Sequence, residues 1–569
     1  MRRIIAIAAC ALTIGVGAVP PRALAVDDTA ISAPAAAPAS NLNWSPCYRA
    51  FGPLQCITVQ VPLDYDNPNG TSISIAMVRL PATDAANRIG SLFLNPGGPG
   101  GSGVDLLLFA VPFLPPPLRA RFDIIGFDPR GIARSTALRC FGTPRQWGPY
   151  FTPFAFPITA EEEEAWITAD RYLDSACEQR GGPIIDHMAT ADVARDLDLL
   201  RQAVGDEKLS YYGISYGSYI GQTYANMFPD NFRALAIDGV LDPIAWSTGA
   251  PGEQDLPFST RLRSDAGAMA TLDEFFRLCD EGGSNCAFSD PTAADAAERF
   301  ADLADLLLAQ PILVVDPVSG ELVPFTYQDL IANALGAMYD SHSWPAFAQL
   351  LAFIHSQASP ADLGAALRAL WQQEGFITKR GFPTYPNFVE GFPAVACSDS
   401  DNPHAYTAWS RAGAESDATF GYFGRIWTWI SSICAEWPGA DADRYMGPFD
   451  QTTTNPVLII GNQFDPATRY EGAVRAHNLL PNSALLTVHA WGHASLGLSG
   501  CAFGVLINYL ISGATPAPGT VCEQDFVPFA APSMASPGAS EGASARQSLN
   551  ASLVPETVWR AIITDRQGN

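Results

Sequence analysis

A serine in a short, glycine-flanked turn is the first residue of this chain with a clear chemical use. The turn is Gly213-Ile-Ser-Tyr-Gly217, between an apolar, aromatic run at 209–212 and a small-residue, apolar stretch at 218–227. This G-x-S-x-G pattern between a predicted strand and a predicted helix is typical of a nucleophile elbow. The turn is so tight that Ser215 must adopt strained backbone angles, with glycine needed two positions to either side. We therefore predict Ser215 as a nucleophile.

A serine hydroxyl needs a base, and that base needs an acid to orient it. On this type of scaffold the acid and then the histidine follow the serine, on loops after strands. Asp465 follows the predicted strand 457–460, and His493 follows the predicted strand at 485–488. The other histidines precede the serine, lie within helical or strand stretches, or belong to an inserted segment: His187, His342, His355, His404, His477 and His489. The predicted triad is Ser215, Asp465 and His493, with no metal and no cofactor.

A glycine-rich loop can supply the donors for a developing oxyanion. The segment Asn95-Pro-Gly-Gly-Pro-Gly-Gly-Ser-Gly103 follows a predicted strand, and its glycines let backbone N–H groups approach a ligand closely. A phosphate-binding loop is disfavoured, because the segment has neither a G-K-[ST] ending nor Rossmann spacing. We predict an oxyanion hole made by the N–H groups of Gly98 and Tyr216, with Gly97 as the alternative to Gly98.

The elements that position these residues predict an α/β fold. Two alternating, β-branched runs at 56–62 and 72–80 predict an antiparallel entry to a sheet. Short apolar runs separated mostly by helical stretches then follow, at 91–94, 122–127, 209–212 and 234–237. Such alternation predicts a mostly parallel, doubly wound sheet.

The strand series stops near residue 242 and resumes only at 457. Connections in α/β units usually take about 2–6 residues, so the intervening chain predicts an inserted, mainly helical cap. Within it, helices are predicted at 292–308 and 329–338 and a hairpin at 312–325, and after a last strand at 485–488 a closing helix at 500–510. The predicted order is signal peptide, disordered leader, first part of the core, cap, second part of the core and low-complexity tail: 1–25, 26–41, 42–242, 243–455, 456–529 and 530–569.

The N-terminus predicts export. A basic start, an apolar run at 4–19 and Ala23-Leu-Ala25 are typical of a secretory signal peptide. We expect a protein outside the cell, with the periplasm or the cell envelope as other destinations, and no membrane span. The net charge of −25 argues against nucleic acid and anionic membranes as partners. We expect a monomer whose partner is its peptide or acyl-ester substrate.

Removal of Cys10 with the signal leaves ten cysteines, an even number that predicts disulfides in an exported chain. Their spacing does not favour zinc. Of the connectivities that ten cysteines allow, pairing of sequence neighbours gives Cys47–Cys56, Cys140–Cys177, Cys279–Cys286, Cys397–Cys434 and Cys501–Cys522.

With these motifs in hand, the chain resembles the secreted tripeptidyl aminopeptidase-like (TAP-like) α/β hydrolases, relatives of the proline iminopeptidases. The resemblance covers about residues 42–525 and rests on these motifs together with Asp128-Pro-Arg-Gly131, Asp238-Gly-Val-Leu-Asp-Pro243 and Ala394-Val-Ala-Cys-Ser-Asp399. It implies a lidded enzyme that releases short peptides from N-termini. The run Gly131-Ile-Ala-Arg-Ser135 departs from the Gly-x-Gly-x-Ser common in the family.

An aminopeptidase must also bind a protonated α-amine, for which a cap carboxylate is expected. The candidates are Glu253, Asp255, Glu390 and Asp399. A carboxylesterase or lipase acting on acyl esters is the alternative, because triad chemistry does not distinguish the two. An inactive hydrolase fold used for binding is the third hypothesis. Asp128 is interpreted as structural, tying its loop together with Arg130.

Overall fold

The computed structural model describes residues 42–530, except 291, 293, 318 and 374–386. Its centre is a ten-stranded sheet in the order β1-β2-β3-β5-β4-β6-β7-β10-β11-β12. The pairs β1–β2, β2–β3 and β3–β5 are antiparallel. All pairs from β5–β4 to β11–β12 in this order are parallel. The strand bounds are β1 Ser45–Pro46, β2 Gln55–Pro62, β3 Ser72–Leu80, β4 Gly90–Asn95, β5 Phe122–Phe127, β6 Leu209–Ile214, β7 Phe232–Asp238, β10 Val457–Phe464, β11 Ser483–Trp491 and β12 Val521–Glu523.

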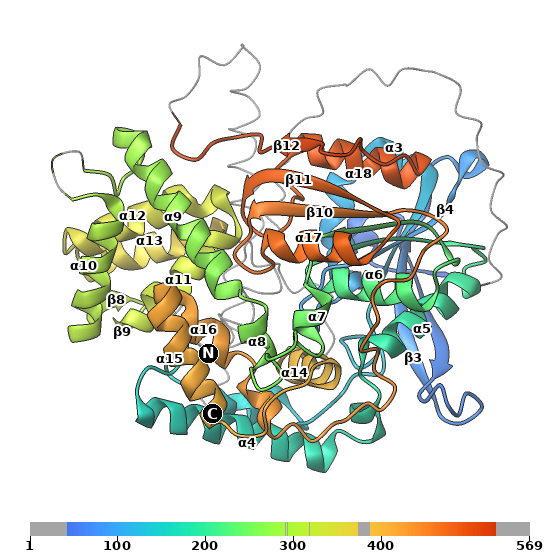
Figure 1. The fold of residues 1–569 in the computed structure, drawn as a ribbon, viewed down its shortest axis with the longest axis horizontal. Coiled ribbons are helices and arrows are strands. Elements are labelled where there is room, and N and C mark those ends of the chain that lie inside the picture. The colour runs from blue at the N-terminus through green and yellow to red at the C-terminus, as the bar shows by residue number, and fades with distance from the viewer. Residues whose placement is uncertain (1–41, 291, 293, 318, 374–386, 531–569) are drawn as a thin grey trace.

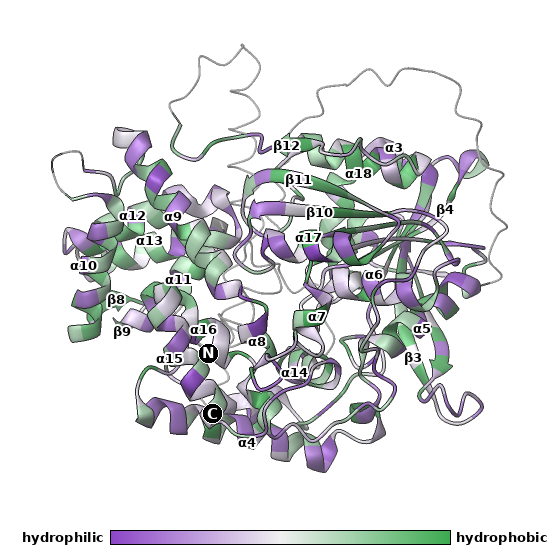
Figure 2. Cartoon of the chain, viewed as in Figure 1, coloured by the Kyte–Doolittle hydropathy of each residue, from purple (hydrophilic) through white to green (hydrophobic). Residues whose placement is uncertain are grey.

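Helices cover both faces of this sheet (Figure 1). Tyr211 and Leu235 pack on one face with α5 Thr190–Ala203, α6 Tyr216–Met227 and α17 Tyr470–Leu479. Tyr212 and Ala236 pack on the other face with α2 Gly103–Ala110, α3 Pro116–Arg121 and α18 Gly500–Ser512. Neighbouring residues of one strand thus enter different cores, which is why these strands read as continuous apolar runs rather than alternating ones. Most of the covering helices carry both hydrophilic and hydrophobic residues (Figure 2).

The residues between β7 and β10 form a second, mainly helical layer beside the sheet (Figure 1). They have a hydrophobic core of their own that includes Phe275, Trp344 and Leu351. The elements are α7 Pro243–Trp246, α8 Phe258–Arg261, α9 Ser264–Gly282, α10 Ala296–Ala309, β8 Ile312–Val315, β9 Leu322–Phe325, α11 Tyr327–Tyr339, α12 Trp344–His355, α13 Pro360–Gln373, α14 Phe388–Asp399, α15 Thr407–Phe420 and α16 Gly424–Trp429. We call this layer the cap.

Helix α4, Ala160–Arg180, belongs by sequence to the first core segment but packs against the cap (Figure 1). The Trp166 indole N–H donates to Ser432 at 2.9 Å, and Glu163 pairs with Arg425 at 2.7 Å. The boundary predicted at residue 242 therefore separates segments of sequence that share one packing unit. An amphipathic helix shows in its sequence that it has a buried face but not which layer covers it.

The strand at 485–488, predicted to be the last, is not the last. After α18 the chain returns to the sheet as β12, which pairs with β11 from Val521 to Glu523. β12 has only three residues, too few for a periodic pattern to show in the sequence. At the opposite edge, β1 adds two residues that pair antiparallel with β2. The predicted helices at 292–308, 329–338 and 500–510 correspond to α10, α11 and α18, and the predicted hairpin to β8–β9.

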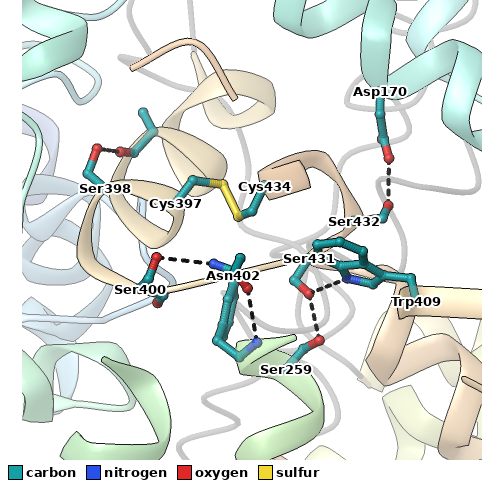
Figure 3. The surroundings of a disulfide bond; sticks show 12 residues. Asp170, Ser259, Cys397, Ser398, Ser400, Asn402, Trp409, Ser431, Ser432 and Cys434 are labelled. Atoms are coloured by element: carbon teal, nitrogen blue, oxygen red, sulfur yellow. Dashed lines mark hydrogen bonds between the residues drawn. A yellow bond between two sulfur atoms is a disulfide. The ribbon is translucent and has the colours of Figure 1, made fainter. Parts of the chain in front are cut away.

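All five disulfides between sequence neighbours are formed, as predicted: Cys47–Cys56, Cys140–Cys177, Cys279–Cys286, Cys397–Cys434 and Cys501–Cys522. Cys397–Cys434 joins the end of α14 to the turn that follows α16 (Figure 3). Beside it, Ser432 hydrogen-bonds to Asp170 of α4 at 2.5 Å. This bridge therefore fastens the part of the cap on which α4 packs.

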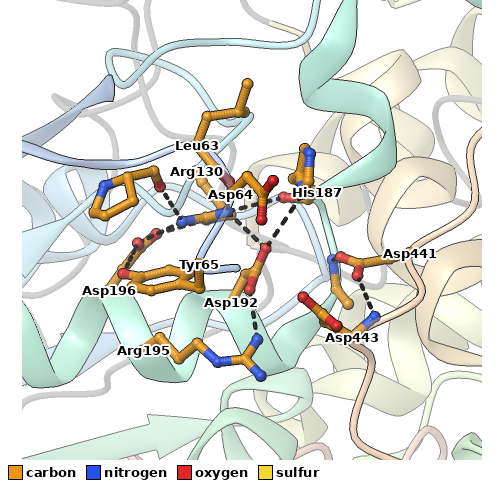
Figure 4. A network of polar contacts seen from close by, with 12 residues as sticks. Leu63, Asp64, Tyr65, Arg130, His187, Asp192, Arg195, Asp196, Asp441 and Asp443 are labelled. Carbon is orange, nitrogen blue, oxygen red and sulfur yellow. Dashed lines mark hydrogen bonds and ion pairs between the residues drawn. The ribbon is translucent and has the colours of Figure 1, made fainter. Parts of the chain in front are cut away.

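A buried arginine joins the β2–β3 connection to α5 (Figure 4). The Arg130 guanidinium lies 2.7 Å from both Asp192 and Asp196, and it also donates to the carbonyls of Leu63 and Pro62. The predicted tie between Arg130 and Asp128 is wrong. A buried guanidinium has five donors to satisfy, and two carboxylates one turn apart on α5 satisfy more of them than one loop carboxylate.

Asp128 accepts hydrogen bonds from donors other than Arg130. Its carboxylate binds the N–H groups of Val104 and Arg134 at 3.2 and 3.0 Å and also the hydroxyl of Ser102. The expectation that Asp128 is structural agrees with these contacts.

The predicted signal peptide and leader, and all but the first residue of the predicted tail, lie outside the described residues. Within the described part of the chain, no helix is both long enough and apolar enough to cross a bilayer.

We expect loss of the Cys397–Cys434 bridge, by serine at both positions, to destabilise the fold more than loss of Cys279–Cys286. The first bridge closes 37 residues and the second only 7, and the unfolded chain gains more freedom from opening the longer loop. Loop-closure entropy gives about 4 against about 2.5 kcal/mol. Melting temperatures of the two double variants measure this order, and equal values or the reverse order would contradict it.

Candidate active site

Ser215 lies between the end of β6 and the start of α6, with φ 59° and ψ −127°. This left-handed conformation is strained for a residue with a side chain and persists only where the surroundings enforce it. A Cβ on Gly213 would come within 2.2 Å of the Gly217 carbonyl oxygen, and one on Gly217 within 2.9 Å of the Asn95 carbonyl oxygen. The two glycines of the motif are therefore required by the close approach of strand and helix. Ser215 is 8% exposed.

The glycine loop after β4 lies directly against this turn. A Cβ on Gly97, where φ is 88°, would come within 2.4 Å of the Ile214 carbonyl oxygen and 2.8 Å of Ser215 Cβ. The Gly97 N–H donates to Asn95 Oδ1 at 2.8 Å, so it is already used. Gly98 lines the hollow beside Ser215, and Tyr216 is the first residue of α6, where backbone N–H groups have no intrahelical partner. The geometry therefore favours Gly98 over Gly97 as the donor beside Tyr216.

His493 and Asp465 meet at the carboxyl ends of β10 and β11. His493 Nδ1 lies 3.0 Å from both carboxylate oxygens of Asp465. Asp465 is 1% exposed and also accepts from the N–H groups of Ala467 and Thr468, at 2.9 and 2.8 Å. His493 Nε2 is buried and has no hydrogen-bond partner among the described residues, so it is available to take a proton.

Two polar side chains that the sequence did not single out hold this pair. The Thr468 hydroxyl lies 3.0 Å from Asp465 Oδ2 and 3.2 Å from His493 Nδ1. The Asn462 side chain donates to the carbonyls of Gly492 and Ala494, on either side of the histidine, at 2.9 and 2.5 Å. Each lies three residues from Asp465 in the sequence. This proximity is the sequence signal by which they could have been found.

The cap contacts the loops that carry Asp465 and His493. The Ser264 hydroxyl, at the start of α9, donates to the Ala467 carbonyl at 2.6 Å, beside Asp465. The backbone N–H of His493 donates to the Tyr339 carbonyl, at the end of α11, at 2.9 Å. The Tyr339 ring also meets the His493 imidazole edge-on, with centroids 5.3 Å apart. The cap is thus part of the site and not only a cover.

A hollow opens beside Ser215 under the cap. Its walls are mainly aromatic and aliphatic, and none of the described residues that line it carries a carboxylate. The lining residues are Gly98, Ser215, Tyr216, Leu241, Trp246, Phe258, Ser259, Leu262, Ser264, Tyr339, Phe392, Trp427, Ile430, Ala467 and Thr468.

None of the four carboxylates expected to bind a substrate amine lines this hollow. Glu253 Oε2 accepts from the Ala250 N–H at 3.0 Å within a loop, and Asp255 is exposed on the same loop. Glu390 is fully buried and accepts from the Cys140 N–H at 3.2 Å. Local contacts thus engage Glu253 and Glu390, and Asp255 lies on the surface.

The fourth candidate, Asp399, lies behind the hollow. Thr190 donates to it through its N–H at 2.7 Å and its hydroxyl at 2.6 Å, and the Trp246 indole N–H donates at 3.2 Å. The Tyr216 hydroxyl is hydrogen-bonded to the same Thr190 hydroxyl. Burial raises the pKa of Asp399 to about 7, against the lowering effect of these hydrogen bonds. Asp399 therefore supports a wall residue and an oxyanion residue from behind.

Among the described residues, one group of carboxylates is close enough together to hold a metal ion. Asp64, Asp66 and Asp443 bring their oxygens within 4.8 Å of one another, near the Arg130 network (Figure 4). None of them lines the hollow beside Ser215.

Two family models match the chain. The model described as alpha/beta hydrolase fold matches residues 90–260, and the model described as TAP-like protein matches residues 419–522. The chain has the α/β-hydrolase fold, and its C-terminal part is similar to the TAP-like proteins. The first match contains Ser215 and the second contains Asp465 and His493. The predicted fold class and the resemblance stated above are both confirmed.

Curated relatives of this serine hydrolase cover most of its length. It is 29% identical to the tripeptidyl aminopeptidase of Streptomyces coelicolor, over 87% of this chain and 88% of the relative. It is also 29% identical to serine protease Hip1 of Mycobacterium tuberculosis, over 84% and 91%. Carboxylesterase B of Mycobacterium tuberculosis is 28% identical, over 89% and 95%. The names of these relatives include both peptidases and an esterase.

We expect Gly97→Ala to lower kcat by at least about 100-fold, the scale of a lost oxyanion donor. The added Cβ would push the loop away from Ile214 and Ser215. Gly182→Ala is the matched control, because Gly182 also has positive φ, 63°, but nothing lies within 4 Å of its added Cβ. Turnover of a chromogenic ester by both variants measures the difference. Similar kcat values for the two would show that the loop contact is not needed.

We expect Asp399→Asn to flatten the dependence of stability on pH. With a folded pKa of about 7 and an unfolded value near 4, Asp399 holds a proton in the folded state that the unfolded chain releases. The free energy of unfolding therefore falls as pH rises from about 4 to about 7, by at most about 1.4 kcal/mol per pH unit. Melting curves from pH 4 to 8 compare wild type, Asp399→Asn and the exposed-site control Asp255→Asn. Parallel curves for the wild type and Asp399→Asn would contradict this assignment.

Proposed function

We propose that this serine hydrolase is a secreted aminopeptidase that releases short peptides, of two or three residues, from peptide N-termini. The observation that carries the proposal is the hollow beside Ser215, where walls from the cap helices α7, α8, α11, α14 and α16 leave room on the acyl side for only a short segment of substrate. An endopeptidase needs an open cleft through which a chain can pass on both sides of the cut. The name of the Streptomyces coelicolor relative, tripeptidyl aminopeptidase, supports the same class.

In the proposed mechanism, His493 Nε2 takes the hydroxyl proton of Ser215 as Oγ attacks the scissile carbonyl. Asp465 holds Nδ1 and stabilises the imidazolium that forms. The backbone N–H groups of Gly98 and Tyr216 bind the oxyanion, each worth about 3–4 kcal/mol. The imidazolium then protonates the leaving amine as the peptide C–N bond breaks. Water, deprotonated by His493, hydrolyses the acyl-enzyme and releases the short peptide.

A carboxylesterase is the second candidate, and two observations favour it. The walls of the hollow are apolar and hold no carboxylate for an α-amine, and one relative is named carboxylesterase B. An acyl ester needs only the apolar walls, the nucleophile and the oxyanion donors. An inactive binding fold is disfavoured, because such a protein has no use for the hydrogen bond between His493 and the buried Asp465, whose loop lines the same hollow as Ser215.

Export is part of the proposal. Five disulfides form in the described chain, and such bridges persist in oxidising surroundings outside the cytoplasm. The predicted signal peptide is consistent with this destination.

We expect the purified protein to cleave chromogenic di- or tripeptide amides with a free N-terminus at least tenfold faster than the same amides acetylated at the N-terminus. Acetylation adds bulk at the N-terminus, which an aminopeptidase places at the inner end of its acyl site. Ser215→Ala should lose at least about 10⁴-fold in kcat, the scale of a lost nucleophile.

A short-chain acyl ester tested beside the peptides separates the two candidates. Cleavage of the ester alone, lost in Ser215→Ala, would move the function to carboxylesterase. Cleavage of acetylated and free peptides at equal rates would overturn the aminopeptidase proposal.

A further inference from the structure

A second hollow adjoins the one beside Ser215. The two share four lining residues, Leu241, Leu262, Ala467 and Thr468. Thr468 is also the residue that holds Asp465 and His493. The second hollow therefore lies next to the acid loop of the triad, at the junction of cap and core.

This hollow is cationic in a chain whose net charge is −25. Three arginines line it, Arg261, Arg263 and Arg469, against two acidic residues, Asp242 and Glu471. Two helices also begin here: α9 follows directly after Arg263, and α17 directly after Arg469. The positive ends of helix dipoles add to the field of the arginines, which favours an anion.

Arg261 supplies charge to this hollow without contacting a ligand. All five of its N–H groups donate to backbone carbonyls, those of Ala245, Leu256, Asp401, Trp246 and Ser247. Burial lowers its pKa to about 10, which still leaves the guanidinium charged at neutral pH. It is a fixed cation behind the hollow whose donors bind neutral oxygens only.

Arg263 and Arg469 can reach a ligand. The Arg263 guanidinium lies over the Phe420 ring at 4.5 Å, and its Nε is 3.7 Å from Asp265. That Nε is buried and has no hydrogen-bond partner within the described ranges. Arg469 pairs through Nε with Glu471 at 3.2 Å, and the Glu471 side chain is 66% exposed. An ion pair with so exposed a partner contributes little free energy. An incoming carboxylate can therefore replace Glu471.

Asp242, the other acidic residue of the lining, is already engaged. Its carboxylate accepts from the N–H groups of Ile244 and Ala245, at the start of α7, and it lies 3.5 Å from Arg475. Its charge is therefore largely offset within the wall. The lining therefore keeps a net positive charge, which favours a ligand with a negative charge.

We propose that the second hollow binds the C-terminal carboxylate of the departing part of a short peptide substrate, through Arg263 and Arg469. The inference rests on the proposed peptidase function and deepens it. The enzyme then selects short oligopeptides with a free C-terminus, because only there does the leaving segment carry a carboxylate within reach of the hollow. Planar guanidinium groups suit carboxylate geometry.

The test compares peptides of one sequence that end in a free carboxylate or in an amide, with leaving segments of one to four residues. At the best length we expect the acid to exceed the amide by at least about tenfold in kcat/KM, the scale of a charged hydrogen bond. In Arg263→Gln/Arg469→Gln we expect the acid-to-amide ratio to fall below about twofold. The ratio is taken within each variant, so that a general loss of activity cancels.

Arg171→Gln is the matched control, because Arg171 is 53% exposed and pairs only with the exposed Glu436 among the ion pairs of the described chain. We expect it to keep the wild-type ratio. A wild-type ratio near one, or an unchanged ratio in the double variant, would overturn the inference. Sodium acetate tests whether the hollow binds free carboxylates independently of the peptide substrate. If acetate inhibits cleavage of the acid and the amide peptides equally, and the acid-to-amide ratio of kcat/KM is near one, the inference is overturned.

Binding to Ser215→Ala, measured by calorimetry, separates this inference from the proposed function. We expect the acid peptide to bind at least about tenfold more tightly than the amide. Equal binding of both would overturn the inference alone. Binding of neither would overturn the peptidase function, and the inference with it.

Discussion

The left-handed backbone of Ser215 is the constraint on which the rest of the site depends. A residue with a side chain adopts φ 59° only where the surrounding chain enforces it. Here β6 and α6 meet so closely that Gly213 and Gly217 cannot carry a Cβ, and Gly97 closes the turn from the side. The turn at Ser215 and the loop of Gly97 and Gly98 are therefore in close contact. A preorganised arrangement of this kind needs no reorganisation when charge develops.

The second half of the site depends on the cap. Ser264 binds the loop of Asp465, and the Tyr339 carbonyl binds the N–H of His493. A cap that moved away as a rigid body would break both hydrogen bonds and loosen the acid and the base. The same residues, Ser264 and Tyr339, line the hollow beside Ser215. The cap residues that line this hollow thus also hold the loops of Asp465 and His493.

Buried charged side chains in this acidic chain are stabilised by neighbouring groups of opposite charge or by hydrogen-bond donors. Arg130 is buried between Asp192 and Asp196, and Asp465 is surrounded by N–H donors. Arg261 differs, because within the described part of the chain its hydrogen bonds go to backbone carbonyl oxygens and not to carboxylates. Placed between the cap and the acid loop, that charge makes the adjoining hollow attractive to an anion, although the surface as a whole repels anions.

The sequence by itself determined the elements that local patterns encode. The parallel strands, the turn at Ser215 and the strand ends that carry Asp465 and His493 follow from apolar runs, glycine spacing and chain order, which involve neighbouring residues only. Only the tertiary structure decided which distant segments meet. In the folded chain, α4 packs against the cap and Arg130 pairs with carboxylates of α5. The four expected carboxylates lie outside the lining of the hollow, and Tyr339 contacts His493. Such contacts depend on how whole layers pack, and no local period or turn signal records that packing.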